Sequence, residues 1–486
     1  MSTATIEELR KKYEVVIGLE VHAQLKTKSK IFAPDGNEFG KEPNSLVSPI
    51  TLGMPGVLPV LNKEVVNMAI LTGLALNCTI PEHCKFDRKQ YFYPDLPKGY
   101  QISQYDEPIC TKGCIDVNGK RIGITRAHLE EDAGKLVHAG ADGIYGSSYS
   151  LVDLNRAGTP LLEIVSEPDM RSSDEAKAYM EELRITLKYI GVCDGNLEEG
   201  SMRCDANISV RPFGQKEFGT RAEIKNVNSF RALQKAIEYE IDRQIEIVEE
   251  GGKVVQETRL WDDNLSVTKS MRGKEDAHDY RYFPEPDLMP LKISQEWING
   301  IKEKMPELPQ ARRERYEALG LSAYDANVIT EQMETALFYD KVLALGADYR
   351  ITNNFLMKEV TAFLKEEKID INESKLTPEA LAELVNMIEK GTISNNIGKN
   401  IITTLLKEGG SAKEIVEKQG LSVISDEGEI KAIIEKIIAD NPAQTEQYRS
   451  GKDKLFGFFV GQVMKATQGR ANPQSLNKLL KESLDK

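Results

Sequence analysis

Two segments of the sequence carry polar side chains at every second position, and the types and spacing of these side chains could support chemistry. In residues 14–25, Glu20, His22 and Gln24 alternate with apolar residues, which is the pattern of a half-buried strand. In residues 201–211, the alternate positions all hold hydrogen-bonding side chains: Ser201, Arg203, Asp205, Asn207, Ser209 and Arg211. This composition indicates a lined cleft, whereas a half-exposed antiparallel sheet with ordinary polar residues is the structural alternative.

Carboxylates within apolar segments of the sequence also indicate a lined cleft. Glu163 lies inside the apolar run 161–165. A second acidic group lies within residues 126–134: His128, Glu130, Glu131 and Asp132. A carboxylate in a strand interior needs a partner, because an unpaired buried charge costs several kcal/mol. That partner is either an arginine or a metal ion.

Carboxylates with one or two imidazoles form an oxygen-rich site, which suits Mg²⁺ or Mn²⁺ better than zinc. The candidate ligands are Glu20, His22, Glu131, Glu163 and Asp205. Phosphoryl transfer needs such an ion together with Arg or Lys side chains that neutralise phosphate charge. Arg203 and Arg211 share the predicted face of Asp205, and residues 86–95 form a basic, aromatic loop. We therefore expect a cation-binding phosphate cleft, with a salt bridge as the alternative role for each arginine.

Several common motifs are absent from the sequence. There is no G-x-x-x-x-G-K-[ST] loop, so a nucleotide would be held by the sheet and by metal ions. Residues 146–148 (GSS) lack the flanking glycines of a serine amidase site, which indicates that this chain does not itself release ammonia. A structural zinc ion is not expected, and buried free thiols are favoured, because the spacing is loose for a zinc site at Cys78, Cys84, Cys110 and Cys114.

The elements that must position these residues fall into distinct parts of the chain. Residues 13–290 are rich in Gly, Pro and β-branched residues with short alternating runs, which predicts strands. After Pro290 the periodicity is helical, with Gly409 and Gly410 between two helical patterns. We therefore predict an α+β fold with domains at residues 1–291, 292–410 and 411–486.

Composition narrows the class of protein further. A chain of 486 residues with 40% hydrophobic content can bury more than one core, and its longest apolar runs fall far short of the roughly 20 residues that a membrane span needs. The polar start and six irregularly spaced cysteines favour the cytoplasm. Residues 449–486 hold eight Lys or Arg and three Asp or Glu, a charge of +5, while the whole chain carries −13. The tail is therefore the expected contact for phosphate groups.

Six longer motifs carry a resemblance to a known family. They lie at residues 16–22, 86–89, 91–104, 129–135, 152–161 and 197–209. Together they strongly resemble the GatB subunits of the aspartyl/glutamyl-tRNA amidotransferases, and the match runs from about residue 13 to the end. The resemblance implies an antiparallel-sheet cradle related to the glutamine synthetase and guanido kinase fold, then an all-α helical domain and a small YqeY-like helical tail.

The resemblance also implies an ATP-dependent ligase that forms a heterotrimer with an amidase, the A subunit, and with a small C subunit. The side-chain carboxylate of Asp or Glu, misattached to tRNA(Asn) or tRNA(Gln), would attack ATP to give an acyl phosphate. Ammonia released from glutamine by the amidase would reach the cradle through a channel and convert the acyl phosphate to the amide. The length of 486 residues leaves no room for the insertion of the archaeal relative, which favours the bacterial type.

With this resemblance, each group of candidate residues receives an expected role. Metal ligands are expected at His22, Glu131 and Glu163, and catalytic groups at Glu20, Glu130, Asp205 and Arg203. Nucleotide contacts are expected at Ser201, Arg203, Asn207 and Arg211. Channel or substrate contacts are expected at Arg88, Lys89, Tyr91 and Tyr93. Contacts between the basic tail and tRNA are expected at Lys452, Lys454, Lys465 and Arg470.

Two hypotheses from other classes remain open at this point. The chain could be a non-catalytic tRNA-binding scaffold that positions substrate for a partner enzyme, although the polar strand faces argue against this. It could also be a freestanding metal-dependent hydrolase, because a carboxylate and histidine cluster does not distinguish water from an acyl oxygen as the nucleophile. Dependence on a partner protein separates the second hypothesis from the function that the family resemblance implies.

Overall fold

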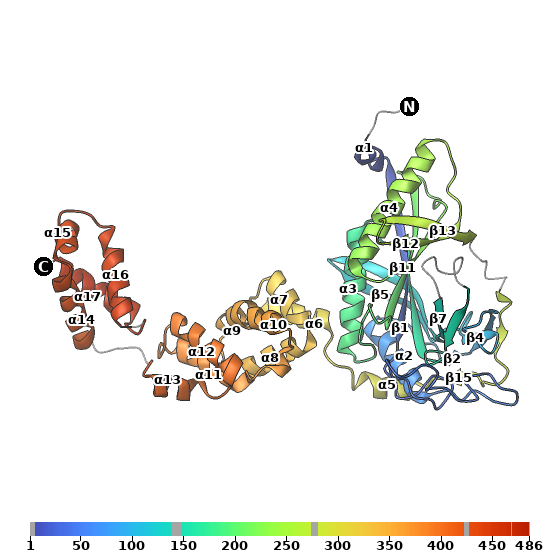
Figure 1. Ribbon diagram of the computed structural model, residues 1–486, viewed down its shortest axis with the longest axis horizontal. Coiled ribbons are helices and arrows are strands. Elements are labelled where there is room, and N and C mark those ends of the chain that lie inside the picture. Colours follow the sequence, from blue (N-terminus) through green and yellow to red (C-terminus); the bar gives the residue numbers. More distant parts are fainter. Residues whose placement is uncertain (1–4, 139–147, 274–279, 422–426, 468, 486) are drawn as a thin grey trace. The chain divides into compact units, whose positions relative to one another are not determined.

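The computed structural model describes residues 5–138, 148–273, 280–421, 427–467 and 469–485. The chain divides into two compact units, Met1–Leu308 and Pro309–Lys486. The described strands all lie in the first unit, and the second unit is helical (Figure 1). Within these ranges, no helix combines the length and the apolar character that crossing a membrane requires.

An eight-stranded sheet forms the centre of the first unit, in the order β13-β12-β11-β10-β1-β9-β6-β5. Its strands are β1 (Tyr13–Gln24), β5 (Cys110–Val117), β6 (Lys120–Glu131), β9 (Pro160–Ser166), β10 (Met202–Pro212), β11 (Ala222–Val227), β12 (Glu257–Asp262) and β13 (Val267–Gly273). The short α1 (Ile6–Arg10) precedes β1. One face of the sheet is covered by α2 (Lys63–Ala75), α3 (Ser173–Tyr189) and α4 (Phe230–Glu249). Apolar side chains between these helices and the sheet form the first core.

The alternation in residues 14–25 explains why β1 can occupy the middle of this sheet. Ile17, Leu19 and Val21 are fully buried on the face that packs against the helices. Glu20 and His22 lie on the opposite face, because successive side chains of a strand point to opposite sides. β1 pairs with β10 on one edge and with β9 on the other, both antiparallel. A slip of one residue would carry the polar set into the core, so the register is strongly specified.

The expectation of an antiparallel sheet needs one correction. β11 and β12 pair in parallel, whereas the other described neighbours in this sheet pair antiparallel. After β11 the chain crosses the helical face as α4 and then enters β12, so the two strands run in the same direction. A helical crossover is the usual connection between parallel neighbours. The sheet is therefore mixed.

Three small sheets accompany the large one, in the pairings β14-β3-β4, β15-β2 and β7-β8. Their strands are β2 (His83–Cys84), β3 (Asp87–Gln90), β4 (Tyr100–Ser103), β7 (Lys135–His138), β8 (Ser150–Asp153), β14 (Phe283–Pro284) and β15 (Leu291–Lys292). Two hydrogen bonds attach β4 to β6: Gln101 Nε2 donates to the backbone oxygen of Glu131 at 2.7 Å, and Ile102 N donates to the Glu131 carboxylate at 2.8 Å. Residues 86–95 are thereby held near the end of β6.

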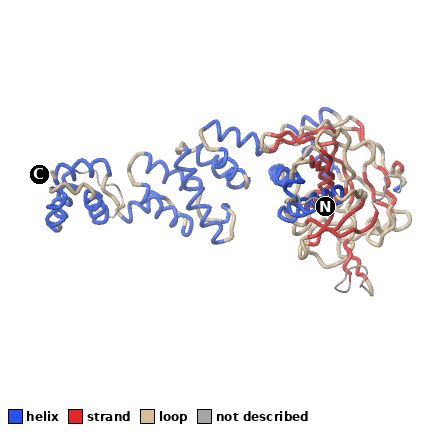
Figure 2. Tube along the Cα trace, turned by 90° about the horizontal axis from the view of Figure 1, so that it is seen from above, coloured by secondary structure: helices blue, strands red, loops and turns tan. Residues whose placement is uncertain are grey.

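The helical unit (Figure 2) contains two apolar cores, one from residues 316–416 and one from residues 430–484. Its first part contains α6 (Pro309–Leu319), α7 (Ala323–Thr330), α8 (Met333–Ala344), α9 (Tyr349–Phe355), the π-helix η3 (Leu356–Val360), α10 (Thr361–Glu367), the 3₁₀ helix η4 (Ile371–Glu373), α11 (Pro378–Glu389), α12 (Asn395–Glu408) and α13 (Ala412–Gln419). Its last part contains α14 (Glu427–Asp440), α15 (Pro442–Arg449), α16 (Leu455–Ala466) and α17 (Pro473–Leu484).

The first compact unit extends past residue 291, where the sequence predicts the end of the first domain. The helix α5 (Gln295–Lys302) packs against α2, and Trp297 Nε1 donates a hydrogen bond to Asn67 Oδ1 at 2.8 Å. The segment up to Leu308 is therefore part of the sheet unit. The division of the chain into three domains stays a prediction.

Candidate metal and phosphate site

Four neighbouring strands bring polar side chains into one row across the face of the sheet that lies opposite the helices. On β1, His22 is the register partner of Arg203 on β10 and of Glu163 on β9. On β6, His128 is the register partner of Glu163. The row therefore joins four segments that are far apart in the sequence, and only the long-range pairing of the strands brings them together.

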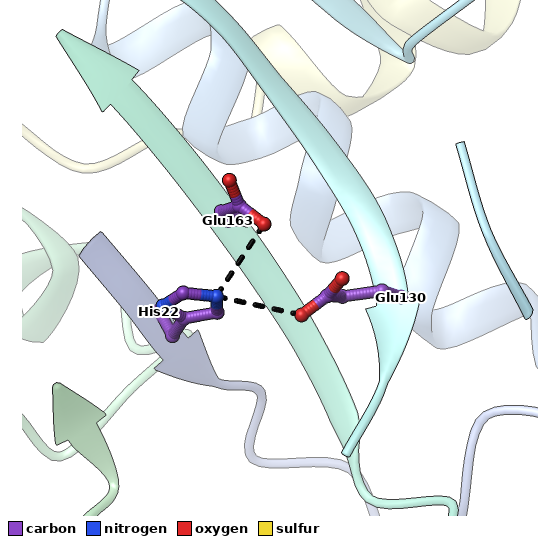
Figure 3. A group of neighbouring side chains, drawn as sticks. All are labelled: His22, Glu130 and Glu163. Atoms are coloured by element: carbon purple, nitrogen blue, oxygen red, sulfur yellow. Dashed lines mark ion pairs between the residues drawn. The ribbon is translucent and has the colours of Figure 1, made fainter. Parts of the chain in front are cut away.

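Three side chains from this region form a compact group, which we call the cluster: His22, Glu130 and Glu163 (Figure 3). His22 Nε2 lies 3.4 Å from Glu163 Oε2 and 3.6 Å from Glu130 Oε1. One ligand atom from each residue lies within 4.8 Å of the other two. Among the described residues, this is the group of three or more His, Cys, Asp or Glu side chains with such spacing.

The charges of the cluster depend on one another. Burial by itself lowers the pKa of His22, but the hydrogen bond and charge of Glu163 outweigh it and raise this pKa to about 9. Burial by itself raises the pKa of Glu163, but the charges of His128 and His22 outweigh it and hold this pKa well below its ordinary value. The two carboxylates thus need positive charge between them, which the protonated imidazole of His22 supplies when no metal is bound.

The donor set fits a hard divalent cation. Two carboxylates and one imidazole offer mainly oxygen ligands, which Mg²⁺ and Mn²⁺ prefer, and no thiolate is present to favour zinc. A cation would replace the proton on His22, because only the neutral imidazole can bind a metal. His128 Nε2 lies 3.3 Å from Glu163 Oε2, and His128 Nδ1 is buried without a hydrogen-bond partner. His128 is thus the direct neighbour of the candidate ligands.

Glu131, which is predicted from the sequence to be a metal ligand, does not join the cluster. Consecutive residues of β6 face opposite sides of the sheet, so Glu131 points away from Glu130. Its carboxylate accepts hydrogen bonds from Lys98 Nζ at 2.5 Å and from Ile102 N at 2.8 Å. Glu130, which is predicted from the sequence to be a catalytic group, instead lies beside His22. Glu130 therefore lies in the cluster, where the sequence predicts Glu131.

The two other predicted carboxylates lie in the next row of the sheet. Glu20 on β1 is the register partner of Asp205 on β10. Asn207 Nδ2 donates a hydrogen bond to Glu20 Oε1 at 2.9 Å, and Lys225 Nζ lies 2.6 Å from Asp205 Oδ2. Lys225 is not among the site residues predicted from the sequence. However, Arg221, Glu223 and Lys225 occupy alternate positions, which is a sequence signal for a polar strand face.

Arg203 adds a guanidinium to the row, beside His22. Its Nη2 lies 2.8 Å from Asp132 Oδ2, and Arg156 Nε lies 3.5 Å from the same oxygen. The charge of Asp132 raises the pKa of Arg203, so the guanidinium stays ionised. Its Nε is buried and has no hydrogen-bond partner. A buried donor without a partner, next to a cation site, fits a phosphate oxygen.

The predicted nucleotide contacts are spread along the whole of β10. Ser201 Oγ donates to Asp194 Oδ2 at 3.3 Å just before the strand, and Arg211 Nε lies 2.6 Å from Glu14 Oε2 near its end. Ten residues of extended chain span about 33 Å, which exceeds the length of a nucleoside triphosphate. Ser201 and Arg211 therefore cannot both contact one nucleotide.

A cavity of about 580 Å³ lies on the same face of the sheet, beside Glu20 and Asn207. Glu20 and Asn207 line it from the central strands, and Phe218 and Arg221 line it from the segment before β11. This volume is typical of a site for a small ligand or cofactor. Because Glu20 is two residues from His22 on the same strand face, a ligand in the cavity would extend towards the cluster.

Residues 86–95, which are predicted from the sequence to be a loop, form the strand β3 and the segment after it, and they divide into anchored and available side chains. Arg88 is anchored, because its guanidinium lies 2.7 Å from Glu285 Oε2 and 3.1 Å from Asp287 Oδ2. Lys89 Nζ lies 4.6 Å from the ring centroid of Tyr280. The rings of Tyr91 and Tyr93 stack at 5.8 Å. Arg88 thus holds this segment to residues 285–287 rather than facing a ligand.

The predicted tail contacts and cysteines lie elsewhere. Lys452, Lys454 and Lys465 are exposed around α16, whereas Arg470 is partly buried and donates through Nε to the backbone oxygen of Thr467 at 3.2 Å. Three of the four cysteines considered for zinc are buried, and Cys78 is partly exposed. In the part of the chain that the structure describes, these thiols do not form a group with the ligand spacing of the cluster.

Comparisons with known proteins bear on the whole chain. The family model described as the GatB/GatE catalytic domain matches residues 15–299, and one described as the GatB domain matches residues 337–484. Curated relatives named as the B subunit of aspartyl/glutamyl-tRNA(Asn/Gln) amidotransferase include one from a Synechococcus species, 56% identical over 97% of this chain and 98% of its own length. Another, from Crocosphaera subtropica, is 56% identical over the full length of both chains, and one from Geotalea uraniireducens is 57% identical over 98% of this chain and all of its own. This chain therefore belongs to the GatB family of aspartyl/glutamyl-tRNA amidotransferase B subunits.

Proposed function

We propose that this chain is the B subunit of a tRNA-dependent amidotransferase and that the cluster is its phosphoryl-transfer site. The substrate would be Asp or Glu attached to tRNA(Asn) or tRNA(Gln), and the product the corresponding Asn or Gln. The observation that carries the proposal is the convergence of His22, Glu130 and Glu163 beside Arg203, in a chain whose relatives bear this name over their full length.

The proposed reaction has two steps. In the first, a side-chain carboxylate oxygen of the misacylated residue attacks the γ-phosphorus of ATP, the bond to the β-phosphate oxygen breaks, and ADP leaves. In the second, ammonia attacks the acyl carbon of the resulting acyl phosphate, loses a proton, and displaces inorganic phosphate. An amidase, the A subunit, would supply ammonia through a channel, and a small C subunit would join the other two in a heterotrimer.

The residues of the site can serve the first step directly. A Mg²⁺ or Mn²⁺ ion held by His22, Glu130 and Glu163 would neutralise charge on the phosphate oxygens. The unpartnered Nε of Arg203 can donate to a phosphate oxygen in the same row, while Asp132 holds the guanidinium in place. Lys225, beside Asp205, adds a second cation in the next row. Fixed cations of this kind stabilise the charge that develops during transfer.

The cavity beside Glu20 and Asn207 is the proposed nucleotide site. Asn207 and Arg221 would contact polar groups of the nucleotide, and Phe218 offers an apolar surface to the base. The nucleotide contacts proposed here therefore centre on Asn207 and Arg203, and exclude Arg211, whose guanidinium is engaged by Glu14.

The finer description of the fold belongs to the same proposal. We infer that the sheet unit is a cradle related to glutamine synthetase and the guanido kinases, and that the last helices form a YqeY-like tail. Domains at residues 1–291, 292–410 and 411–486 are consistent with separate apolar cores in the helical part.

The decisive experiment measures ATP consumption by the assembled complex on misacylated tRNA, together with trapping of the acyl phosphate by hydroxylamine. Glu163→Gln keeps the shape of the side chain and removes its charge, so we expect a loss of about 100-fold or more in both readouts. Glu249→Gln is the control, because Glu249 forms an ion pair with Lys12 on the far end of β1. Normal ATP consumption by Glu163→Gln would contradict the kinase assignment and favour a non-catalytic scaffold.

The hydrolase hypothesis makes a different prediction in the same assay. A freestanding hydrolase would act on its substrate without a partner protein, whereas the proposed site amidates only when ammonia is supplied. Complete amidation from glutamine by this chain alone would contradict the proposal that a separate amidase subunit releases the ammonia. Amidation by the chain with added ammonium salt, but not with glutamine, would support it.

A further inference from the structure

Five tyrosine rings form a continuous row across the sheet unit, in the order Tyr93, Tyr91, Tyr280, Tyr282 and Tyr105. At one end, Tyr91 stacks on Tyr93, and at the other, Tyr105 stacks on Tyr282 with centroids 4.3 Å apart and an interplanar angle of 10°. Tyr280 lies between them, 6.3 Å from Tyr91 and 6.1 Å from Tyr282. Residues from two segments almost 200 positions apart thus make one aromatic surface, which we call the tyrosine row.

Both ends of the tyrosine row are open to solvent. The fractional exposure is 38% for Tyr93 and 42% for Tyr105, and the neighbouring Phe92 is 74% exposed. Exposed aromatic rings are costly to leave in water when they could pack inside, and a group of them marks a binding surface. A further flat ring could therefore stack at either end without displacing a buried side chain.

One end of the tyrosine row reaches the cluster. Tyr105 follows Ser103 by two residues, and Ser103 Oγ donates to Glu130 Oε2 at 3.4 Å. Arg126, which precedes His128 by two residues on β6, donates from Nη1 to the backbone oxygen of Tyr105 at 3.1 Å. Burial raises the pKa of Tyr282, and the negative charges of Glu130 and Glu163 raise it further. A molecule lying on the row would therefore end beside the candidate metal ligands.

Two cations, Lys89 and Arg126, flank the tyrosine row. In the described part of the chain, no carboxylate oxygen lies within 4.0 Å of Lys89 Nζ or of the Arg126 guanidinium, whereas the adjacent Arg88 has two such partners. Lys89 lies over the ring of Tyr280, in the middle of the row, and Arg126 lies at its cluster end. Cations beside aromatic rings offer contacts to phosphate groups and to bases together.

We propose that the tyrosine row, with Lys89 and Arg126, binds the unpaired 3′ end of the aminoacyl-tRNA and directs its aminoacyl group to the cluster. The inference rests on the proposed function. Single-stranded nucleotides present one π-face and one phosphate per residue, and proteins bind them with aromatic platforms and basic side chains. The amino acid is esterified to the ribose of the terminal nucleotide, so stacking of that end sets where its carboxylate lies.

A purely structural role is the alternative for these rings. The segment at residues 280–290 packs on β3 through β14, and the tyrosine contacts could serve only to hold it there. That role predicts equal losses with every substrate, because a displaced segment would disturb the cluster itself. Stacking of the 3′ end predicts losses only with substrates that have nucleotides upstream of the terminal adenosine.

The test compares two substrates with the assembled amidotransferase, ATP and glutamine: misacylated tRNA and a 3′-aminoacyl adenosine that lacks the upstream nucleotides. For Tyr93→Leu and Lys89→Gln, which change the row away from its cluster end, we expect the KM for misacylated tRNA to rise about 10-fold, the size of one lost stacked base or phosphate contact. The KM for aminoacyl adenosine should stay within about twofold of the wild type. Tyr93→Trp should keep the wild-type KM, because indole also stacks on bases.

Two variants serve as matched controls. Lys63→Gln removes a lysine that lies 5.5 Å from the ring of Trp297, and Tyr239→Leu removes the edge contact between Tyr239 and Trp261, both away from the cluster. Neither should change the KM for misacylated tRNA.

Three outcomes would overturn the inference. An unchanged KM for misacylated tRNA in both variants would show that the row does not bind it. Equal losses with the two substrates would assign the rings a structural role. If the wild-type complex amidated neither substrate, the proposed function itself would be wrong. This outcome is distinct from the other two, because it is measured on the wild-type complex alone.

Discussion

The cluster and the basic tail both contain charged residues, but those of the cluster are largely buried and the tail lysines are exposed to solvent. In the cluster, Glu130 is 4% exposed and its carboxylate lies 3.6 Å from His22 Nε2 and 3.4 Å from Ser103 Oγ. In the tail, Lys452 and Lys454 are exposed just before α16 and Lys465 is exposed within it, where water screens each charge. Buried charges interact strongly and act as a unit, whereas exposed charges contribute separately and weakly. The cluster should therefore fail on a single substitution, and the tail should lose affinity gradually.

The largest effect is expected from the adjacent pair of carboxylates on β6. Glu130→Gln removes a candidate ligand, so the affinity of the complex for Mn²⁺ should fall about 100-fold. Glu131→Gln removes a carboxylate that faces Lys98 on the other side of the sheet, so the affinity for Mn²⁺ should stay close to that of the wild type. Titration followed by electron paramagnetic resonance measures both. Equal losses in the two variants would contradict the assignment of Glu130 rather than Glu131.

A second prediction concerns a buried amine in the sheet unit, Lys30, which forms no ion pair with a carboxylate of the described residues. Lys30 is fully buried, and its Nζ donates to the backbone oxygens of Leu46 and Leu154, at 2.7 and 3.4 Å. Burial lowers the pKa of Lys30 from its ordinary 10.5 to about 8. Between these values the unfolded chain holds a proton that the folded chain has lost, so the free energy of unfolding rises with pH in this range.

Lys30→Met removes this proton linkage. The wild type should therefore gain stability relative to Lys30→Met as the pH rises from about 8 to 10.5, by up to about 3 kcal/mol. Denaturant unfolding of both proteins at several pH values measures the difference. A constant difference across this range would mean that Lys30 keeps its proton when folded.

The tail should respond to the number of charges removed. Changing Lys452, Lys454 and Lys465 together to Gln should reduce the slope of log affinity for tRNA against log salt concentration by up to about 3. Assembly with the partner proteins should be unchanged, as it should be when residues 449–486 are removed. An unaltered slope in the triple variant would exclude these lysines as phosphate contacts.

The smallest effect should come from one tail lysine alone. Lys465→Gln should lower tRNA affinity by less than about threefold at moderate salt, because a single exposed charge is screened. Arg470 provides the contrast within the tail, since it donates to the backbone of Thr467. Arg470→Gln should therefore lower the temperature of thermal unfolding more clearly than it lowers the affinity for tRNA. A large loss of tRNA affinity with unchanged thermal stability would instead make Arg470 a direct tRNA contact.

Local patterns in the sequence predict a large part of the fold and a smaller part of the site. Alternation of polar and apolar residues identifies the polar faces of β1 and β10. This pattern is local, because successive side chains of a strand point to opposite faces of the sheet. Alternation also places Glu130, rather than Glu131, on the same side of β6 as His128. The parallel pairing of β11 with β12 is not visible locally, because it depends on which edge of the sheet the chain re-enters after α4.

Contacts between distant segments explain what could not be predicted from the sequence. No spacing rule links Tyr91 to Tyr280, and their contact exists because β14 pairs with β3. The extent of the proposed nucleotide site likewise depends on the cavity beside Asn207. Residues from several distant segments line this cavity. Residues that act through long-range pairing become identifiable only when the register of the strands is known.

The central place of β1 also has a consequence for synthesis of the protein. β1 leaves the ribosome well before its partners β9 and β10, which begin at Pro160 and Met202. At typical rates of translation, about 140 further residues take on the order of ten seconds. During that time the apolar face of β1 and both of its hydrogen-bonding edges have no native partner, so the nascent chain depends on chaperones or on transient contacts with α2 to avoid aggregation.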